Sequence, residues 1–307
     1  MFNRKFTGLF ILIALAAPLF AGGGAEAEVD KENYFVSIVP QAYLLERIVG
    51  DRAEVTVMVP PGKSPATYEP TPQQVMELGE AAAYFTLGVP FEQNFIPTIE
   101  ASLPELRLID GAAGIERRHL EAHDHEEEGH EEGDHKEEGH DDHEEGAIDP
   151  HVWFSPVLGQ VIARNMAATV MADDPEGKDV YQANLDSLIQ DLDTLDKELA
   201  EILAPVKGET LFVYHPAFGY FADRYGLHQE AIEVGGKEPS AAVLEHIIEE
   251  AIEDGVHIVL VQPEFAQASA EAVANAIGGV VVPVAPLSKD YINNMKALAQ
   301  QLQEGLK

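Results

Sequence analysis

The chain has 307 residues, 46% of them hydrophobic, which is enough apolar material for one large or two medium globular domains. Its 19 Lys and Arg against 54 Asp and Glu give a formal net charge of −35 at pH 7, which disfavours nucleic acid and anionic membrane surfaces as partners and favours cations. Because the sequence contains no cysteine, any metal site must be built from His, Asp, Glu and water.

Residues 1–27 predict a secretory signal peptide. A basic start, Met1 to Lys5, precedes an apolar run from Leu9 to Ala21, and small residues follow as far as Ala27. The apolar run is too short to cross a bilayer comfortably, which separates this pattern from a membrane helix. We therefore expect a periplasmic or cell-surface protein. Without a cysteine to carry a lipid, it is expected to be soluble after cleavage or held by an uncleaved signal.

The next part of the chain, residues 28–175, alternates short β-rich runs with segments long enough for helices. Such alternation indicates parallel βαβ units, so we predict an N-terminal α/β lobe. The strand candidates are Tyr34 to Val39, Val55 to Val59, Ala82 to Leu87 and Leu106 to Ile109.

A low-complexity run of His, Glu, Asp and Gly interrupts this lobe at about residues 119–146. Between Glu121 and Glu145, fourteen Asp or Glu stand against one Lys, a net charge of −13. A run with so few apolar residues cannot bury a core, so we predict a disordered loop.

The histidines of this run predict an auxiliary metal-capture loop. Neutral imidazole is a good ligand for zinc, copper and nickel, and the surrounding carboxylates concentrate cations. The loop is expected to bind several ions weakly, since ordering it costs conformational entropy. A solvated linker that happens to be rich in histidine is the alternative interpretation. The histidines are His119, His123, His125, His130, His135, His140 and His143.

Residues 176–205 predict one long amphipathic linking helix. Apolar residues recur from Val180 to Leu203 at gaps of mostly three and four, and Pro205 ends the run. A helix of this length is more plausible as a rigid connection between two lobes than as an isolated surface element.

Alternation then resumes and predicts a second α/β lobe over residues 206–307. The strand candidates are Leu211 to Tyr214, Ala231 to Val234, Ile258 to Val261 and Val280 to Val284. The helix candidates are Ala241 to Glu253, Ala268 to Ile277 and Asp290 to Glu304.

Two histidines outside the loop stand out by their positions. His151 follows Asp149 and Pro150 where the ordered pattern returns, and His215 comes directly after the predicted strand that ends at Tyr214. In open α/β sheets, ligands bind beyond the carboxyl ends of the strands, which is where His215 falls. Either histidine alone is more often structural, but both together, beside a metal-collecting loop, favour a role as ligands. The other histidines lack such a context: His228, His246 and His257.

Four blocks of the sequence resemble the metal-binding proteins of zinc and manganese ABC importers, the cluster A-I substrate-binding proteins. They are PPGKSPATYEPTPQQV from Pro60, DPHVWFSP from Asp149, VYHPAFGYFADRYGL from Val213 and VAPLSKDY from Val284. The resemblance covers essentially the whole mature chain, and the acidic His-rich insertion is typical of the zinc-preferring members. It implies two Rossmann-like α/β lobes joined by a long rigid helix, with the metal in the interlobe cleft. It also implies that the protein captures zinc and delivers it to an ABC transporter permease in the membrane.

The resemblance further implies which residues bind the metal. The DPH and VYHPAFGY blocks match, so His151 and His215 are the implied ligands. Two other positions depart from the family pattern. Its first histidine would follow Pro65, where this chain has Ala66, and its carboxylate would stand where this chain has Ala285. Methyl groups cannot coordinate a metal.

Two histidines leave a zinc ion short of its usual four ligands. Glu264 is the first candidate to complete the shell, because it follows the predicted strand that ends at Val261, at the same carboxyl-end cleft as His215. A surface carboxylate at a helix start is the alternative for Glu264. The further candidates are Tyr68, Glu69, Gln262, a histidine of the loop and water.

The sequence favours zinc over manganese or another divalent transition metal, because the predicted site is rich in nitrogen ligands. We expect a monomer with no catalytic residues. A zinc-dependent hydrolase is the rival class, but neither an HExxH sequence nor a Gly-x-Ser-x-Gly elbow occurs. A metal buffer acting mainly through the loop, or an adhesin on the importer scaffold, is the third hypothesis, which Ala66 and Ala285 keep open.

Overall fold

The computed structural model describes residues 31–120, 147–233, 239–253, 255–263, 265 and 267–306. The chain divides into two units, residues 1–30 and 31–307, and the fold described below is that of the second unit. The predicted signal peptide, the candidate ligand Glu264 and six of the seven predicted loop histidines lie outside the described residues. Within the described part of the chain, no helix has both the length and the apolarity needed to cross a membrane.

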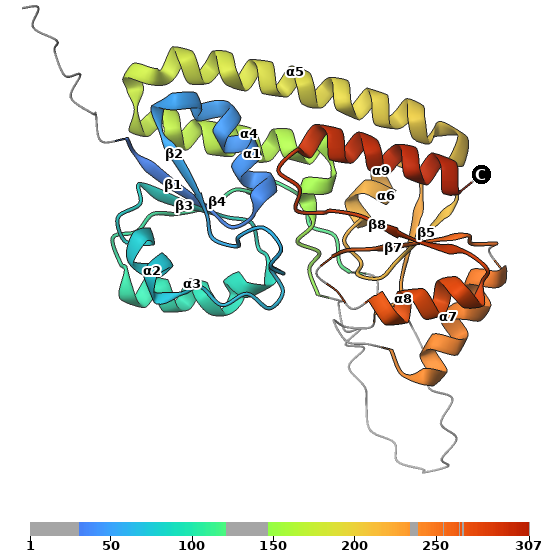
Figure 1. The fold of residues 1–307 in the computed structure, drawn as a ribbon. Helices are drawn as coiled ribbons and strands as arrows, with labels where there is room; N and C mark the ends of the chain where they lie inside the picture. The colour runs from blue at the N-terminus through green and yellow to red at the C-terminus, as the bar shows by residue number, and fades with distance from the viewer. Residues whose placement is uncertain are drawn as a thin grey trace, which may run out of the picture. The chain divides into compact units, whose positions relative to one another are not determined.

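The N-terminal lobe is built on a parallel sheet with the strand order β2-β1-β3-β4 (Figure 1). Its central strands carry the sequences NYFV and AYFT, and most of their side chains are fully buried, as is typical of strands with helices on both faces. The strands are β1 Asn33–Val36, β2 Glu54–Val57, β3 Ala83–Thr86 and β4 Leu108–Asp110. The helices are α1 Val39–Val49, α2 Pro72–Leu78, α3 Pro90–Ser102 and α4 Pro156–Asp173.

Proline and threonine fix the starts of the helices in this lobe. Pro72, Pro90 and Pro156 stand in the first turns of α2, α3 and α4, where the missing N–H group would have had no partner within the helix. Before α2, the Thr71 hydroxyl accepts a hydrogen bond from the Gln74 N–H group, forming a capping box. The segments that precede these three helices all contribute residues to the cavity described below.

One long helix, α5 Lys178–Leu203, packs against both lobes (Figure 1). Its 26 residues make it about 39 Å long. It contacts α1 and α4 of the N-terminal lobe and α6 and α9 of the C-terminal lobe. The apolar residues of its buried face are Tyr181, Leu185, Leu188, Leu192, Leu195, Leu199 and Leu203.

The C-terminal lobe repeats the architecture with a second parallel sheet of order β6-β5-β7-β8. The strands are β5 Thr210–Val213, β6 His228–Ala231, β7 Ile258–Val261 and β8 Val280–Pro283. The helices are α6 Gly219–Tyr225, α7 Ala241–Glu253, α8 Gln267–Ala276 and α9 Tyr291–Gly305. The predicted fold class, two α/β lobes joined by a long helix, is therefore confirmed.

The strand predicted from Ala231 to Val234 is wrong in position, because β6 ends where that strand was expected to begin. Pairing with β5 sets His228 opposite Thr210 and Ala231 opposite Val213. The sequence HQEA lacks the apolar pattern of a buried strand, but its polar residues are accommodated. The buried Gln229 side chain accepts a hydrogen bond of 2.7 Å from the Phe218 N–H group.

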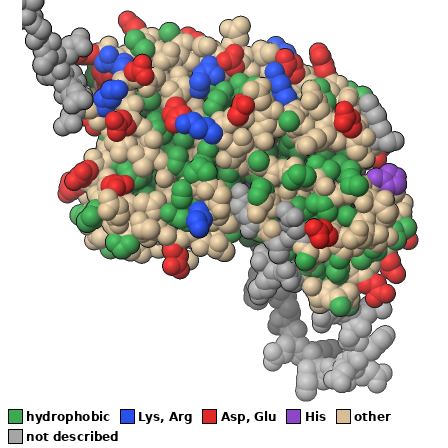
Figure 2. Space-filling model, in the orientation of Figure 1, with side chains coloured by type: hydrophobic (Ala, Val, Ile, Leu, Met, Phe, Trp, Pro, Cys, Tyr) green, Lys and Arg blue, Asp and Glu red, His purple; other side chains and the backbone are tan. Residues whose placement is uncertain are grey.

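Charged side chains of both signs are interspersed over the face drawn in Figure 2. Elsewhere in the fold, charged side chains form ion pairs between elements, such as Arg47 with Asp191 at 2.7 Å and Arg52 with Asp174 at 2.6 Å. Exposed and partly exposed pairs of this kind contribute little to stability, because water and salt screen them. On this face the negative charge is therefore not gathered into one patch.

Candidate metal centre

His151 lies in a short segment between the two lobes, just before a 3₁₀ turn (Val152–Phe154) that leads into α4. The side chain is 10% exposed, and that of Asp149 is fully buried. One oxygen of Asp149, Oδ1, lies 2.9 Å from the His151 backbone nitrogen and 2.7 Å from its Nδ1 atom. A carboxylate only accepts hydrogen bonds, so we assign the ring proton of His151 to Nδ1.

His215 is held in the same way by a second carboxylate. It lies two residues beyond the end of β5, and Glu233 lies two residues beyond the end of β6. Because Val213 and Ala231 are paired in the parallel sheet, His215 and Glu233 leave its carboxyl edge side by side. The Nδ1 atom of His215 is 2.5 Å from Oε1 of Glu233, which is buried, so this ring proton is also assigned to Nδ1.

The two imidazole rings meet at their remaining nitrogens. The Nε2 atoms of His151 and His215 are 3.3 Å apart, and the ring planes are inclined at 76°. With both Nδ1 atoms protonated, each Nε2 presents a lone pair to the other, which is unfavourable unless a cation lies between them. Two nitrogen ligands at 2.0–2.1 Å from a tetrahedral zinc ion are separated by about 3.3 Å. The pair therefore has the spacing of two ligands of one zinc ion.

The surroundings of His151 favour the neutral ring that a metal needs. Burial lowers the pKa of His151 from its ordinary value of 6.5, and the hydrogen bond to Asp149 only partly opposes this effect. An imidazole must be deprotonated at one nitrogen to bind a metal, so a lowered pKa reduces competition from protons.

A cavity opens beside the histidine pair, and both lobes contribute to its wall. Phe265 stacks on the His215 ring with centroids 4.7 Å apart, and Trp153 meets the His151 ring edge-on at 5.1 Å. Much of the wall is apolar, which strengthens electrostatic interactions inside it. Its apolar members include Pro65, Ala66, Val89, Ile148, Phe265 and Leu287.

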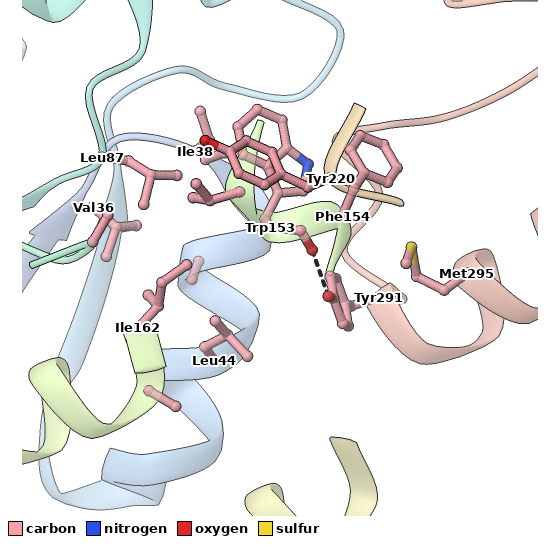
Figure 3. Close-up of a cluster of buried hydrophobic side chains, with 14 of the residues drawn as sticks. Val36, Ile38, Leu44, Leu87, Trp153, Phe154, Ile162, Tyr220, Tyr291 and Met295 are labelled. Carbon is pink, nitrogen blue, oxygen red and sulfur yellow. Dashed lines mark hydrogen bonds between the residues drawn. The ribbon is translucent and has the colours of Figure 1, made fainter. Parts of the chain in front are cut away.

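Residues far along the chain form hydrogen bonds to Trp153. The Trp153 indole N–H donates to the Pro286 carbonyl oxygen at 3.1 Å, and the Tyr291 hydroxyl donates to the Trp153 carbonyl oxygen at 2.5 Å. Figure 3 shows this second bond and places Trp153 and Phe154 among side chains of both lobes, from Leu87 to Met295. The position of His151 is thus set by packing of the segment that follows it.

The structure places the other predicted site residues in different environments. Ala66 lines the cavity, so the position where the family pattern expects a histidine faces the site. Ala285 instead lines a separate cavity with Phe154 and Phe218. Gln262 lines the first cavity and donates through Nε2 to the His215 carbonyl oxygen at 2.9 Å.

Two of the alternative ligands lie away from the histidine pair. The Tyr68 hydroxyl donates to Oε1 of Gln74 at 2.8 Å, and Glu69 is exposed. Neither is among the described residues that line the cavity. Among all the residues that the structure describes, no group of three or more His, Asp and Glu is arranged to hold a metal. Glu264 lies outside the described residues.

His119 stands at the base of the predicted capture loop. It forms an antiparallel bridge with Ile148, and the Leu120 N–H group donates to the Ala147 carbonyl oxygen at 2.8 Å. The residues on either side of positions 121–146 are therefore paired with each other, and Leu120, Ala147 and Ile148 line the cavity. The other six loop histidines lie outside the described residues.

Sequence reasoning missed the two carboxylates behind the histidines. A sequence signal was present for one of them, because Asp149 lies two residues before His151, within reach of an Asx-type turn. Glu233 had no local signal, since it lies two residues beyond the end of β6, a strand whose position was wrongly predicted.

The chain matches one family model and many known proteins. The model described as "Zinc-uptake complex component A periplasmic" matches residues 35–305. The high-affinity zinc uptake system protein ZnuA of Bacillus subtilis (strain 168) is 29% identical over 325 residues, which cover 99% of this chain and 98% of that protein. The zinc-binding lipoprotein AdcA of Streptococcus pneumoniae (strain ATCC BAA-255 / R6) is 29% identical over 324 residues, which cover 96% of this chain but 61% of AdcA.

Solved structures show the same likeness in three dimensions. A crystal structure of ZnuA superposes with a TM-score of 0.80 at 37% identity and covers 91% of this chain and 100% of that chain. A deletion mutant of ZnuA with zinc bound gives a TM-score of 0.79 at 36% identity and covers 90% of this chain and 98% of that chain.

Proposed function

Because the chain belongs to the family of the periplasmic component A of zinc-uptake complexes, we propose that it captures one zinc ion between His151 and His215 for an ABC importer. The resemblance to metal-binding proteins of zinc and manganese importers is thereby confirmed at the level of the family. The observation that carries the proposal is the approach of two Nε2 atoms to 3.3 Å, each on a ring whose Nδ1 faces a buried carboxylate.

This arrangement is that of a carboxylate–histidine–metal site. A carboxylate on the far ring nitrogen fixes the tautomer and the ring orientation, and it raises the basicity of the nitrogen that binds the metal. Two nitrogen ligands favour zinc over manganese, which prefers oxygen. In the proposal, Glu264 or water supplies the remaining ligands.

The wider role follows from the family and from the predicted export. We propose that the mature protein acts outside the cytoplasm as a monomer, and that an ABC transporter permease in the membrane takes the ion from it. The 121–146 segment, whose flanking residues Leu120 and Ala147 line the cavity, would raise the local zinc concentration. In this proposal the protein is a carrier and not a hydrolase, so zinc-loaded protein should not turn over ester or peptide substrates.

The first prediction concerns the histidine pair. Loss of an outer-shell partner typically weakens metal binding by about 10–100-fold. His151→Ala and His215→Ala should each weaken zinc binding by more than this, because each removes a direct ligand. Competition with a chromophoric chelator would measure the dissociation constant. His246→Ala is the matched control, since its side chain is 52% exposed on α7 and its Nε2 atom lies 3.3 Å from Oε1 of Glu250.

Deletion of residues 121–145 separates this function from a metal buffer that works through the loop. The proposed function predicts that one tight zinc site per chain survives the deletion and that the weaker sites disappear. If all tight binding left with the loop, the site between the histidines would be ruled out as the main zinc site.

A further inference from the structure

Arg118 connects the two segments that carry the metal-binding histidines. Its Nη1 atom lies 3.6 Å from Oδ2 of Asp149, and its Nε atom lies 3.2 Å from Oδ2 of Asp223 on α6. Asp149 is the carboxylate behind His151, and α6 is the helix that follows His215 in the chain. The Arg118 side chain is 16% exposed, and its guanidinium group thus stands between both halves of the site.

The Asp149 carboxylate is fully buried and depends on few partners. Its Oδ1 atom accepts both hydrogen bonds from His151, whereas Oδ2 accepts none from the described residues. A buried carboxylate without nearby positive charge is strongly unfavourable. The Arg118 guanidinium supplies that charge on the side of Oδ2, so it stabilises the acceptor that keeps the His151 proton on Nδ1.

Tyr220 fixes the backbone around the same contact. Its hydroxyl accepts a hydrogen bond of 3.0 Å from the Arg118 N–H group and donates one of 3.1 Å to the Asp149 carbonyl oxygen. The Asp149 N–H group in turn donates to the Arg118 carbonyl oxygen at 2.9 Å. The guanidinium carbon also lies 5.9 Å from the centre of the Tyr220 ring.

Glycine at position 219 leaves the space that the guanidinium group fills. A Cβ atom added there would lie 1.2 Å from Nη1 of Arg118 and 2.9 Å from Oδ2 of Asp149. A methyl group cannot share that volume, so Gly219→Ala must displace the guanidinium group. This gives a way to move the cation without removing it.

We propose that Arg118 is a positioning residue for the zinc site: it holds Asp149 on His151 and ties that carboxylate to the helix that follows His215. The inference rests on the proposed function, because the consequence for zinc needs His151 to be a ligand. Arg118 acts through Asp149 and does not touch the metal. Its effect on the tautomer of His151, by contrast, exists without any metal.

The experiment uses the full chain and two readouts. Long-range ¹H–¹⁵N spectra of the metal-free protein report which ring nitrogen of His151 carries the proton, with the signal assigned by its loss in His151→Ala. Chelator competition reports the zinc dissociation constant. Arg118→Met should mix the two tautomers and weaken zinc binding by about 10–100-fold, the range found for outer-shell partners. Arg118→Lys keeps the positive charge, so it should retain part of the wild-type tautomer preference and part of the wild-type zinc affinity.

The control and the double variant make the test specific. Arg117→Met removes the neighbouring cation, which donates to the Leu87 carbonyl oxygen, and should leave both readouts as in the wild type. Gly219→Ala should weaken zinc binding in the wild-type background but have almost no effect once Arg118 is Met, because the side chain that it displaces is gone.

Two results would overturn the proposal: a wild-type tautomer and zinc affinity in Arg118→Met, or the same fold loss from Gly219→Ala in both backgrounds. If Arg118→Met fails to fold, Arg118→Lys and Gly219→Ala decide the question. If the wild type itself binds no zinc, the proposed function fails, whereas the tautomer of His151 still tests the role of Arg118.

Discussion

Each histidine of the candidate site is defined by the carboxylate behind it as much as by its own ring. The carboxylates of Asp149 and Glu233 face Nδ1 of His151 and His215, so both Nε2 atoms are left as acceptors. An amide at either carboxylate position can donate a hydrogen bond, and it would then favour the opposite tautomer. At the scale of single residues, the charge of the partner therefore sets the ligand form of the imidazole.

Glu233→Gln tests this dependence. The change keeps the size of the side chain but removes the obligate acceptor, so zinc binding should weaken by about 10–100-fold. Isothermal titration calorimetry at constant pH would measure the change. Glu209→Gln is the matched control, because it removes one negative charge from an exposed position in the same lobe. Equal zinc affinities of Glu233→Gln and wild type would show that Glu233 does not orient His215.

The sequence was sufficient to single out both histidines as candidate ligands, but not to predict how the pair is oriented. His151 and His215 lie at breaks between periodic segments, where ligands of α/β folds bind, and this signal is local. The contact between His215 and Glu233 instead depends on the pairing of Val213 with Ala231, which no local pattern in HQEA reveals. Ala66 and Ala285, equivalent departures in the sequence, line different cavities, although Pro286 and Leu287, which follow Ala285, line the cavity beside the histidine pair.

At the scale of elements, α5 gives both lobes a common packing surface. The sequence was sufficient to predict this helix, because the apolar residues of a buried helix face recur every three or four residues. Leu192, on this face, is fully buried, and its Cδ1 atom would lie 3.9 Å from a Cβ atom at Gly159 of α4. The close approach of α4 and α5 leaves little room for the surrounding side chains to relax.

Leu192→Ala should therefore lower the free energy of unfolding by about 2–5 kcal/mol, through lost burial and a residual cavity. Urea denaturation would measure the loss. Val180→Ala on the same helix, where the side chain is 47% exposed, should change stability by no more than about 0.5 kcal/mol. Because Leu192 is not among the residues that line the cavity, the folded variant should keep wild-type zinc affinity. A loss of affinity without a loss of stability would contradict this assignment.

At the scale of the whole molecule, the candidate site couples folding to the protonation of His151. Burial holds the pKa of His151 below its ordinary value of 6.5, so the unfolded chain takes up this proton at a higher pH than the folded chain does. The contribution of neutral His151 to the free energy of unfolding is fully present above about pH 6.5. It is lost as the pH falls from that value towards the lower pKa of the folded state.

Metal-free protein should therefore lose stability on mild acidification in a way that His151→Gln does not. Glutamine can still donate a hydrogen bond to Asp149 but takes up no proton, so the variant lacks this contribution to the pH dependence. Denaturation of both proteins at a series of pH values from 8 to about 5 would measure their free energies of unfolding. The difference between the two proteins removes the contribution of the carboxylates that both contain. The wild type should lose stability relative to the variant below about pH 6.5. A difference that stays constant over this range would show that His151 has the same pKa in the folded and unfolded chains, and burial would then not be what keeps its ring neutral for zinc.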